Sequence, residues 1–147
     1  MSRYEIRPAL ESESGQITDL IHEAGINPTG LSWRRFLVAV EDSGRVIGCG
    51  QIKPHGKDIL ELASIAVRPA YQGRGIARKL IETLLAQSPR PLYLMCMEHN
   101  GPLYEKFGFR KIKYGAMPKY FQRIWKLFGA AKALRQVEEN LLVMKLE

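Results

Sequence analysis

The stretch from Ile65 to Leu80, IAVRPAYQGRGIARKL, constrains the fold of this chain more than any other. An apolar run typical of a strand ends at Val67, a turn follows at Arg68-Pro69, and helical periodicity begins after Gly75. Glycine has no Cβ, so at a strand-to-helix junction it allows unusual dihedrals and lets a ligand approach the backbone. The first N–H groups of a helix and its positive dipole end bind anions, above all phosphates. We therefore predict a pyrophosphate-binding loop here.

The basic residues Arg74, Arg78 and Lys79 add positive charge to this stretch. Its spacing differs from the Gly-x-Gly-x-x-Gly fingerprint of dinucleotide sites, and the Gly-Lys-Ser/Thr of a P-loop is absent from the sequence. The order Gln-x-x-Gly-x-Ala after IAVRPAY resembles motif A of the GNAT superfamily of acyl-CoA-dependent N-acetyltransferases. The later run EHNGPLYEKFGFRKI is similar to the second cofactor-site motif of the same family. The resemblance extends from about Val38 to Lys113.

This resemblance implies acetyl-CoA (coenzyme A) as the acyl donor, with its pyrophosphate on the loop from Gln72 to Ala77. It also implies that the strand end at Ile65 to Val67 pairs with the pantetheine amides, as an added strand pairs with an open sheet edge. Asn100 then bonds the pantetheine or the pyrophosphate arm, or else caps a helix. The cofactor-binding residues that we expect are Ile65, Ala66, Val67, Gln72, Gly73, Arg74, Gly75, Ile76, Ala77, Asn100 and Tyr104.

Tyr104 is the residue that we expect to protonate the departing thiolate. It matches the family's Tyr in LYEKFGF, which in that family sits beside the sulfur as a general acid. A phenol has an intrinsic pKa of about 10, near the value of about 8.5 for a thiol, so a proton can pass between the two groups at neutral pH. The alternative is a Tyr whose ring simply packs between helix and sheet.

Glu61 is the expected catalytic base, because a carboxylate inside an apolar strand is unusual. Burial would raise its pKa towards a range that suits proton transfer. Glu61 precedes Val67 by the spacing at which some family members carry a general-base Glu, which often acts through water. The alternative is a solvated Glu that faces outward. Glu98 and His99 are weaker candidates for the base.

The hydrophobic pattern predicts one α/β (α+β) GNAT-like domain over residues 1–147. We expect a central, mixed, mostly antiparallel twisted sheet of six to seven strands, with helices on both faces and a V-shaped splay between Ile59–Val67 and Leu92–Met97. Strands are expected over residues 3–7, 36–40, 46–52, 59–67, 92–97, 109–113 and 140–145, and helices up to residue 24 and over 75–87, 100–106 and 119–128.

Turn and cap residues set the expected boundaries. Ser12 or Ser14 is expected to cap the first helix, and Gly25 to end it. The turns that we expect lie at 42–44 and 54–57, with a short helical turn at 31–35 and a continuation of the last helix over 130–137.

The composition narrows the function classes. Lys and Arg outnumber Asp and Glu by 22 to 15, a formal net charge of +7, which suits an anionic ligand, nucleic acid or an anionic membrane surface, unless it is only a solvated basic surface. No apolar run is long enough to span a bilayer, and the N-terminus lacks a signal peptide's apolar core, so we expect a cytoplasmic protein. The isolated Cys49 and Cys96 predict neither a zinc site nor a disulfide, and we expect no metal.

The acceptor is less clearly indicated. The resemblance implies that residues 26–35 and 114–128, which contain several aromatic and basic side chains, form the acceptor site. Arg34 and Arg35 are candidates to hold a carboxylate of an amino-acid acceptor. Residues 119–135 are an insertion relative to the minimal family pattern: a lid, a partner or oligomer surface, a membrane-surface helix through Lys119–Phe128, or a helix that packs its apolar face on the domain.

These observations favour an N-acetyltransferase that moves an acetyl group directly to a primary amine of a small molecule or peptide. A non-catalytic acyl-CoA-binding regulatory module is the alternative, and a basic nucleic-acid-binding protein is a third class that has only charge in its favour. The partners that we expect are acetyl-CoA and an amine acceptor, with a homodimer left open and no specific nucleic acid.

Overall fold

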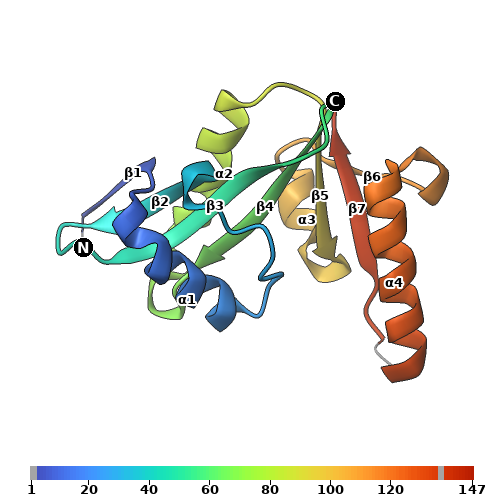
Figure 1. The fold of residues 1–147 in the computed structure, drawn as a ribbon, viewed down its shortest axis with the longest axis horizontal. Helices are drawn as coiled ribbons and strands as arrows, with labels where there is room; N and C mark the ends of the chain where they lie inside the picture. The colour runs from blue at the N-terminus through green and yellow to red at the C-terminus, as the bar shows by residue number, and fades with distance from the viewer. Residues whose placement is uncertain (1–2, 136–137) are drawn as a thin grey trace. The chain divides into compact units, whose positions relative to one another are not determined.

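The computed structural model describes residues 3–135 and 138–147 and contains a seven-stranded sheet with strand order β1-β2-β3-β4-β5-β7-β6 (Figure 1). The strands are β1 (Tyr4–Pro8), β2 (Phe36–Glu41), β3 (Val46–His55), β4 (Ile59–Val67), β5 (Leu92–Met97), β6 (Arg110–Lys111) and β7 (Leu141–Leu146). The helices are α1 (Ser14–Ala24), α2 (Ile76–Gln87), α3 (Gly101–Glu105) and α4 (Lys119–Arg135). Neighbouring strands pair antiparallel at β1–β2, β2–β3, β5–β7 and β6–β7, whereas β4 and β5 pair in parallel at Glu61 and Tyr93. The mixed, mostly antiparallel sheet with a central β4 is confirmed.

Contacts within the chain separate two compact units: Met1–Lys53 with Leu62–Pro89, and Pro54–Glu61 with Arg90–Glu147. The expectation of one domain over 1–147 and that of a splay between Ile59–Val67 and Leu92–Met97 therefore stay predictions. Among the described residues, no helix combines the length and apolar character that crossing a membrane requires.

In the first unit, α1 and α2 cover opposite faces of the sheet. Cys49 of β3 belongs to the buried cluster that includes Ile17 and Leu20 of α1. A Cβ on Gly48 would lie 3.1 Å from Ile76 of α2, and one on Gly50 would lie 3.1 Å from Leu84. Because successive residues of a strand face opposite sides, the alternation of Cys49 with the two glycines puts one helix on each face. The glycines let α2 pack closely on β3.

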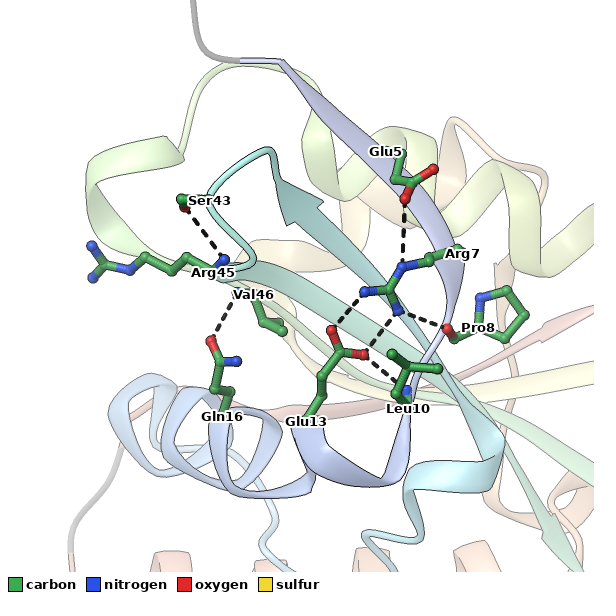
Figure 2. Close-up of polar contacts among 9 residues, drawn as sticks. All are labelled: Glu5, Arg7, Pro8, Leu10, Glu13, Gln16, Ser43, Arg45 and Val46. Carbon is green, nitrogen blue, oxygen red and sulfur yellow. Dashed lines mark hydrogen bonds and ion pairs between the residues drawn. The ribbon is translucent and has the colours of Figure 1, made fainter.

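A pair of charged side chains anchors the start of α1 (Figure 2). The Arg7 guanidinium donates to both carboxylate oxygens of Glu13 at 2.9 and 2.7 Å, and the Leu10 N–H donates to Glu13 at 2.8 Å. These hydrogen bonds lower the pKa of Glu13. The predicted cap by Ser12 or Ser14 is wrong, because a 3₁₀ turn over Glu11–Glu13 precedes α1 and Glu13 takes the N-cap position. The expected end at Gly25 is confirmed, with φ +67°.

In the second unit, α3 and α4 also lie on opposite faces. Phe121 of α4 is buried with Tyr93 of β5 and Val143 of β7. Gly101, the first residue of α3, would meet Leu142 at 2.9 Å if it carried a Cβ. Since Leu142 and Val143 are adjacent in β7, they face opposite sides of the sheet. The prediction of helices on both faces thus holds in each unit.

Several predicted boundaries differ from the structure. β3 continues through Pro54 and His55, so the turn expected at 54–57 begins only at Gly56. The strand expected over 109–113 shortens to Arg110–Lys111, the two residues that pair with β7, and the chain then enters a 3₁₀ turn at Tyr114–Ala116. α4 runs without a break past residue 128 to Arg135, and the part of the expected continuation at 136–137 lies outside the described residues.

Candidate active site

The predicted phosphate loop lies in the first unit, between the end of β4 and the start of α2. After Val67 the chain makes a 3₁₀ turn over Pro69–Tyr71, and α2 begins at Ile76. Gly73 and Gly75 both have φ +79°, a conformation that residues with a Cβ rarely adopt. Added Cβ atoms at these two glycines would meet no described atom within 4 Å, so the space above the loop is open. Within the described residues no side chain caps α2, which leaves its first N–H groups available to an anion.

Gln72 ties this loop to the strand before it. Its side-chain Nε2 donates to the backbone oxygen of Val67 at 3.1 Å. The hydrogen bond closes the path from the end of β4 to the glycines, so the Gln72 side chain has a structural part in shaping the loop. The backbone from Gly73 to Ala77 is the part of this loop for which phosphate binding is predicted.

The positive charges beside the loop are not equivalent. Arg78 forms an ion pair with Glu82, four residues further along α2, at 2.8 Å. The Arg74 guanidinium instead lies 5.2 Å from the centroid of the Tyr71 ring. Lys79 likewise rests near an aromatic ring, and neither it nor Arg74 has an acidic ion-pair partner among the described residues. The charge available to an anionic ligand therefore comes mainly from Arg74 and Lys79.

Ser64 is an irregular residue in the middle of β4. Its φ is +61°, and it is the one residue other than glycine with a positive φ in the described chain. Gln51 of β3, which is fully buried, donates from Nε2 to the Ser64 hydroxyl at 2.8 Å and to the backbone oxygen of Gly30 at 3.2 Å. Strained residues of this kind are maintained by their surroundings and cluster at functional sites. Ser64 directly precedes the predicted pantetheine-binding backbone at Ile65.

Glu61 lies in the second unit and is almost completely buried, with 4% of its surface exposed. The solvated, outward-facing alternative is therefore wrong. His55, at the end of β3, places Nε2 at 2.7 Å from Glu61 Oε1. His55 was not expected at the site, because Pro54 and His55 fall within the predicted turn at 54–57, whereas β3 extends through both residues.

Aromatic side chains from α4 surround the His55 ring. The Tyr120 ring stacks on it at a centroid distance of 3.7 Å, and the Phe121 ring meets it edge-on at 5.9 Å. Burial, and then the negative charge of Glu61, raise the pKa of Tyr120. The start of α4 thus contributes to the surroundings of Glu61, a role that the sequence left among several alternatives for residues 119–135.

Tyr104 lies in α3 of the second unit, with its ring edge-on to Phe109 at a centroid distance of 6.2 Å. Burial, with a smaller contribution from Cys96, raises the pKa of Tyr104 to about 12. The phenol consequently keeps its proton throughout the neutral range. Burial also raises the pKa of the Cys96 thiol to about 11, so a thiol in these surroundings holds its proton more strongly than one in water.

The two weaker candidates for the base, Glu98 and His99, form contacts with residues near the start of β7. His99 contacts Glu139 through its backbone N–H at 2.9 Å and through its ring Nδ1. Glu98 accepts a hydrogen bond from the backbone of Asn140 at 3.1 Å, which joins the end of β5 to the start of β7. Asn100 occupies the N-cap position of α3, but its side chain makes no capping hydrogen bond, so the helix-cap alternative is wrong.

The two predicted acceptor arginines differ in their surroundings. Arg35 donates to the backbone oxygen of Gly30 at 3.2 Å and to Gln51 at 3.4 Å, so it helps hold the loop before the 3₁₀ turn over Trp33–Arg35. The guanidinium of Arg34 lies over the Trp33 ring at 4.7 Å. Of the pair, Arg34 is therefore the freer one to meet a carboxylate.

The structure distributes the predicted site residues over both units, and their relation across the units stays a prediction. The first unit holds the strand end at Ile65–Val67 and the loop at Gln72–Ala77, and the second holds Glu61, Asn100 and Tyr104. Within the second unit, the structure brings Glu61 together with His55 and Tyr120.

The family profile of the Acetyltransferase (GNAT) domain matches residues 32–111, more than half of the chain. The chain belongs to the GNAT acetyltransferase family. This GNAT chain is 34% identical over 98 residues to a mycothiol acetyltransferase of Mycobacterium sp. (strain JLS), a match covering 59% of this chain and 31% of that protein. It therefore spans about a third of the length of that curated relative.

Solved structures with the same fold include other acetyltransferases. The N-acetylglutamate synthase of Neisseria gonorrhoeae, complexed with coenzyme A and N-acetyl-glutamate, superposes with a TM-score of 0.75 at 19% identity, over 100% of this chain and 36% of that one. A GNAT family acetyltransferase from Brucella melitensis in complex with acetyl-CoA has a TM-score of 0.59 at 27% identity, over 75% of this chain and 84% of that one. These likenesses confirm the GNAT fold.

Proposed function

We propose that this chain is an N-acetyltransferase that moves an acetyl group from acetyl-CoA to a primary amine of a small molecule or peptide, by direct transfer in a ternary complex. The observation that carries the proposal is the open loop at Gly73 and Gly75, whose left-handed glycines precede an uncapped helix beside Arg74. The loop lies inside the segment that matches the family profile. The Brucella melitensis relative, solved in complex with acetyl-CoA, supports acetyl-CoA as the donor.

The proposed donor site uses the backbone for most of its contacts. The N–H groups from Gly73 to Ala77 would hold the pyrophosphate, with charge from Arg74. The backbone at Ile65–Val67 would pair with the pantetheine amides, which are regularly spaced donors and acceptors. The Asn100 side chain, which does not cap its helix, would reach the pantetheine or the pyrophosphate arm.

Transfer requires three events. The acceptor ammonium must lose a proton before its nitrogen can attack, and we place this step near Glu61. The backbone N–H of Val67 would polarise the thioester carbonyl as negative charge develops on its oxygen. Tyr104, whose pKa of about 12 keeps it protonated, would donate its hydroxyl proton to the departing thiolate. Desolvation also raises the pKa of a thiol, as at Cys96, and this reduces the uphill cost of that proton transfer.

The function is tested by measuring free thiol release from acetyl-CoA against amino acids, amines and peptides. We expect release that depends on the acceptor, together with an acetylated product whose mass rises by one acetyl group. Stabilisation by acetyl-CoA without thiol release for any acceptor would instead favour a non-catalytic acyl-CoA-binding module. Absence of both would contradict the proposal. The cytoplasmic location and a homodimer remain part of the proposal.

A further inference from the structure

The turn between β3 and β4 brings a histidine and a glutamate together. β3 ends at His55, the chain reverses through Gly56, which has φ +68°, and β4 starts at Ile59. Two residues into β4, Glu61 Oε1 lies 2.7 Å from His55 Nε2, with 13% of the His55 side chain and 6% of the Glu61 side chain exposed. The pair therefore sits in a largely dry environment, where a hydrogen bond of a carboxylate is strong.

The imidazole is held in one orientation. Tyr120 stacks on one face with an interplanar angle of 20°, and Phe121 meets the ring at 79°. Phe121 is itself fully buried against Tyr93, which is the residue of β5 opposite Glu61. A half-turn of the ring would keep the stacking but would move Nε2 away from Glu61 and break the hydrogen bond.

This geometry selects a tautomer. An ionised carboxylate only accepts hydrogen bonds, so Nε2 of a neutral His55 must carry the hydrogen. The lone pair then lies on Nδ1. Within residues 3–135 and 138–147, the ring makes no second hydrogen bond, so Nδ1 is available to a proton. A histidine oriented by a carboxylate in this way is a general base in other enzymes.

The charged groups near the pair come from β4, α4 and β7. Glu61 places a negative charge beside the imidazole, and the neutral Tyr120 phenol covers one face. Two cationic side chains lie near residues that neighbour the pair. The charge of Arg123 opposes the rise in the pKa of Tyr120, and Lys145 Nζ lies 5.7 Å from the centroid of the Tyr93 ring. The charged group in direct contact with the imidazole is therefore the carboxylate of Glu61.

We propose that His55 Nδ1 is the base that accepts the proton of the acceptor ammonium, and that Glu61 is its positioning residue. The inference rests on the proposed acetyl transfer. His55 takes one proton from the ammonium, and the free amine nitrogen then forms the C–N bond to the acetyl carbon. The C–S bond breaks, its electron pair goes to sulfur, and the thiolate gains the hydroxyl proton of Tyr104. The second nitrogen proton passes to the Tyr104 phenolate and restores the phenol, and His55 releases the first proton to solvent. The products are the amide, the free thiol and one proton released to solvent.

The test is chemical rescue. In the thiol-release assay, His55→Ala should lower kcat by about 10²-fold or more, with the KM for acetyl-CoA changed less than threefold. Added imidazole should then raise the kcat of the His55→Ala protein at least tenfold, because it can occupy the space that the side chain leaves. The exposed histidine of α1 provides a matched control, since His22→Ala should keep full activity and gain nothing from imidazole. Thermal unfolding of each variant checks that the fold persists.

A second measurement does not depend on turnover. In the ¹⁵N NMR spectrum of the full chain, the neutral His55 ring should be the Nε2–H tautomer, and Glu61→Gln should shift the Nε2 resonance and lower kcat by at least tenfold. His55→Gln provides a second variant if the alanine protein unfolds, and it should show the same loss of kcat without rescue. Two results would contradict the assignment of His55 as the base: a kcat of His55→Ala within threefold of the parent value, or a folded His55→Ala protein that loses activity and is not rescued by imidazole. If the unsubstituted chain releases no thiol with any acceptor, the transfer function itself fails and the base with it.

Discussion

Gln51 donates a hydrogen bond to the hydroxyl of Ser64 at 2.8 Å and thereby holds the irregular residue of β4 in place. Ser64 keeps a φ of +61° in the middle of a strand, where extended dihedrals are the rule. The same amide group bonds the backbone of Gly30. One buried side chain thus links the irregular point of β4 to the loop that precedes β2.

Replacing this amide should destabilise the first unit. Gln51→Leu keeps the volume but removes both donated hydrogen bonds, and we expect a loss of about 1–3 kcal/mol in the free energy of unfolding, measured by urea denaturation. Ser64→Gly should stay within about 1 kcal/mol of the parent, because glycine adopts this φ freely while the hydroxyl contact is lost. If Gln51→Leu leaves stability unchanged, the amide does not maintain Ser64.

A negative side chain at Gly75 should abolish binding of acetyl-CoA. Gly75 has φ +79° and is the N-cap residue of α2, so Gly75→Glu places a carboxylate where we propose the pyrophosphate. We expect affinity to fall by about 100-fold or more in isothermal titration calorimetry. Gly75→Asn is the matched control, because asparagine tolerates the left-handed region and adds no charge. Unchanged affinity in Gly75→Glu would contradict the assigned phosphate site.

Removing the Tyr104 hydroxyl should affect turnover far more than donor binding. Tyr104→Phe keeps the ring that contacts Phe109, so we expect kcat to fall by about 10²-fold while the Kd of acetyl-CoA changes little. The raised pKa, about 12, also predicts that ionisation of this phenol does not limit the rate between pH 7 and 10. Equal kcat for the two proteins would remove Tyr104 from the mechanism.

The Arg7–Glu13 pair predicts a pH dependence of stability. The pKa of Glu13 is lowered in the folded chain, so the stabilisation is complete above the ordinary value of 4.5 and is lost as pH falls through the lowered one. Glu13→Gln should therefore cost about 1–3 kcal/mol at pH 7, with a smaller difference from the parent at pH 3. The exposed Glu11 offers a control, and Glu11→Gln should leave the unfolding free energy within about 0.5 kcal/mol at both pH values.

The sequence was most informative where function depends on local backbone geometry. The glycines at 73 and 75 and the start of α2 could be predicted because strand, turn and helix signals follow one another within a few residues. The buried state of Glu61 was left open, since a single carboxylate in an apolar strand fits either face. Burial follows from the tertiary structure, in which β4 pairs with β5 at Tyr93 and the start of α4 packs against His55.

His55 was missed because Pro54 favours a turn, whereas the structure extends β3 through both residues. The available signal was the position of His55 and Glu61 on either side of the turn that contains Gly56, which fits a hairpin that brings the two side chains near each other. The positive φ of Ser64 could not be predicted from its residue type. The available signal was Gln51, an amide within an apolar strand, which indicates a buried polar partner.

The contact between His55 and Glu61 spans only six residues of chain. Closing so short a loop costs little conformational entropy, and such contacts form early in folding. The contact between the proposed base and its carboxylate is therefore encoded in one hairpin, while the proposed donor loop is encoded in another segment more than ten residues later. Substitutions in this hairpin can consequently change which amine is deprotonated while the residues that form the proposed phosphate loop stay the same. Acceptor preference can therefore diverge among chains that use the same acetyl donor.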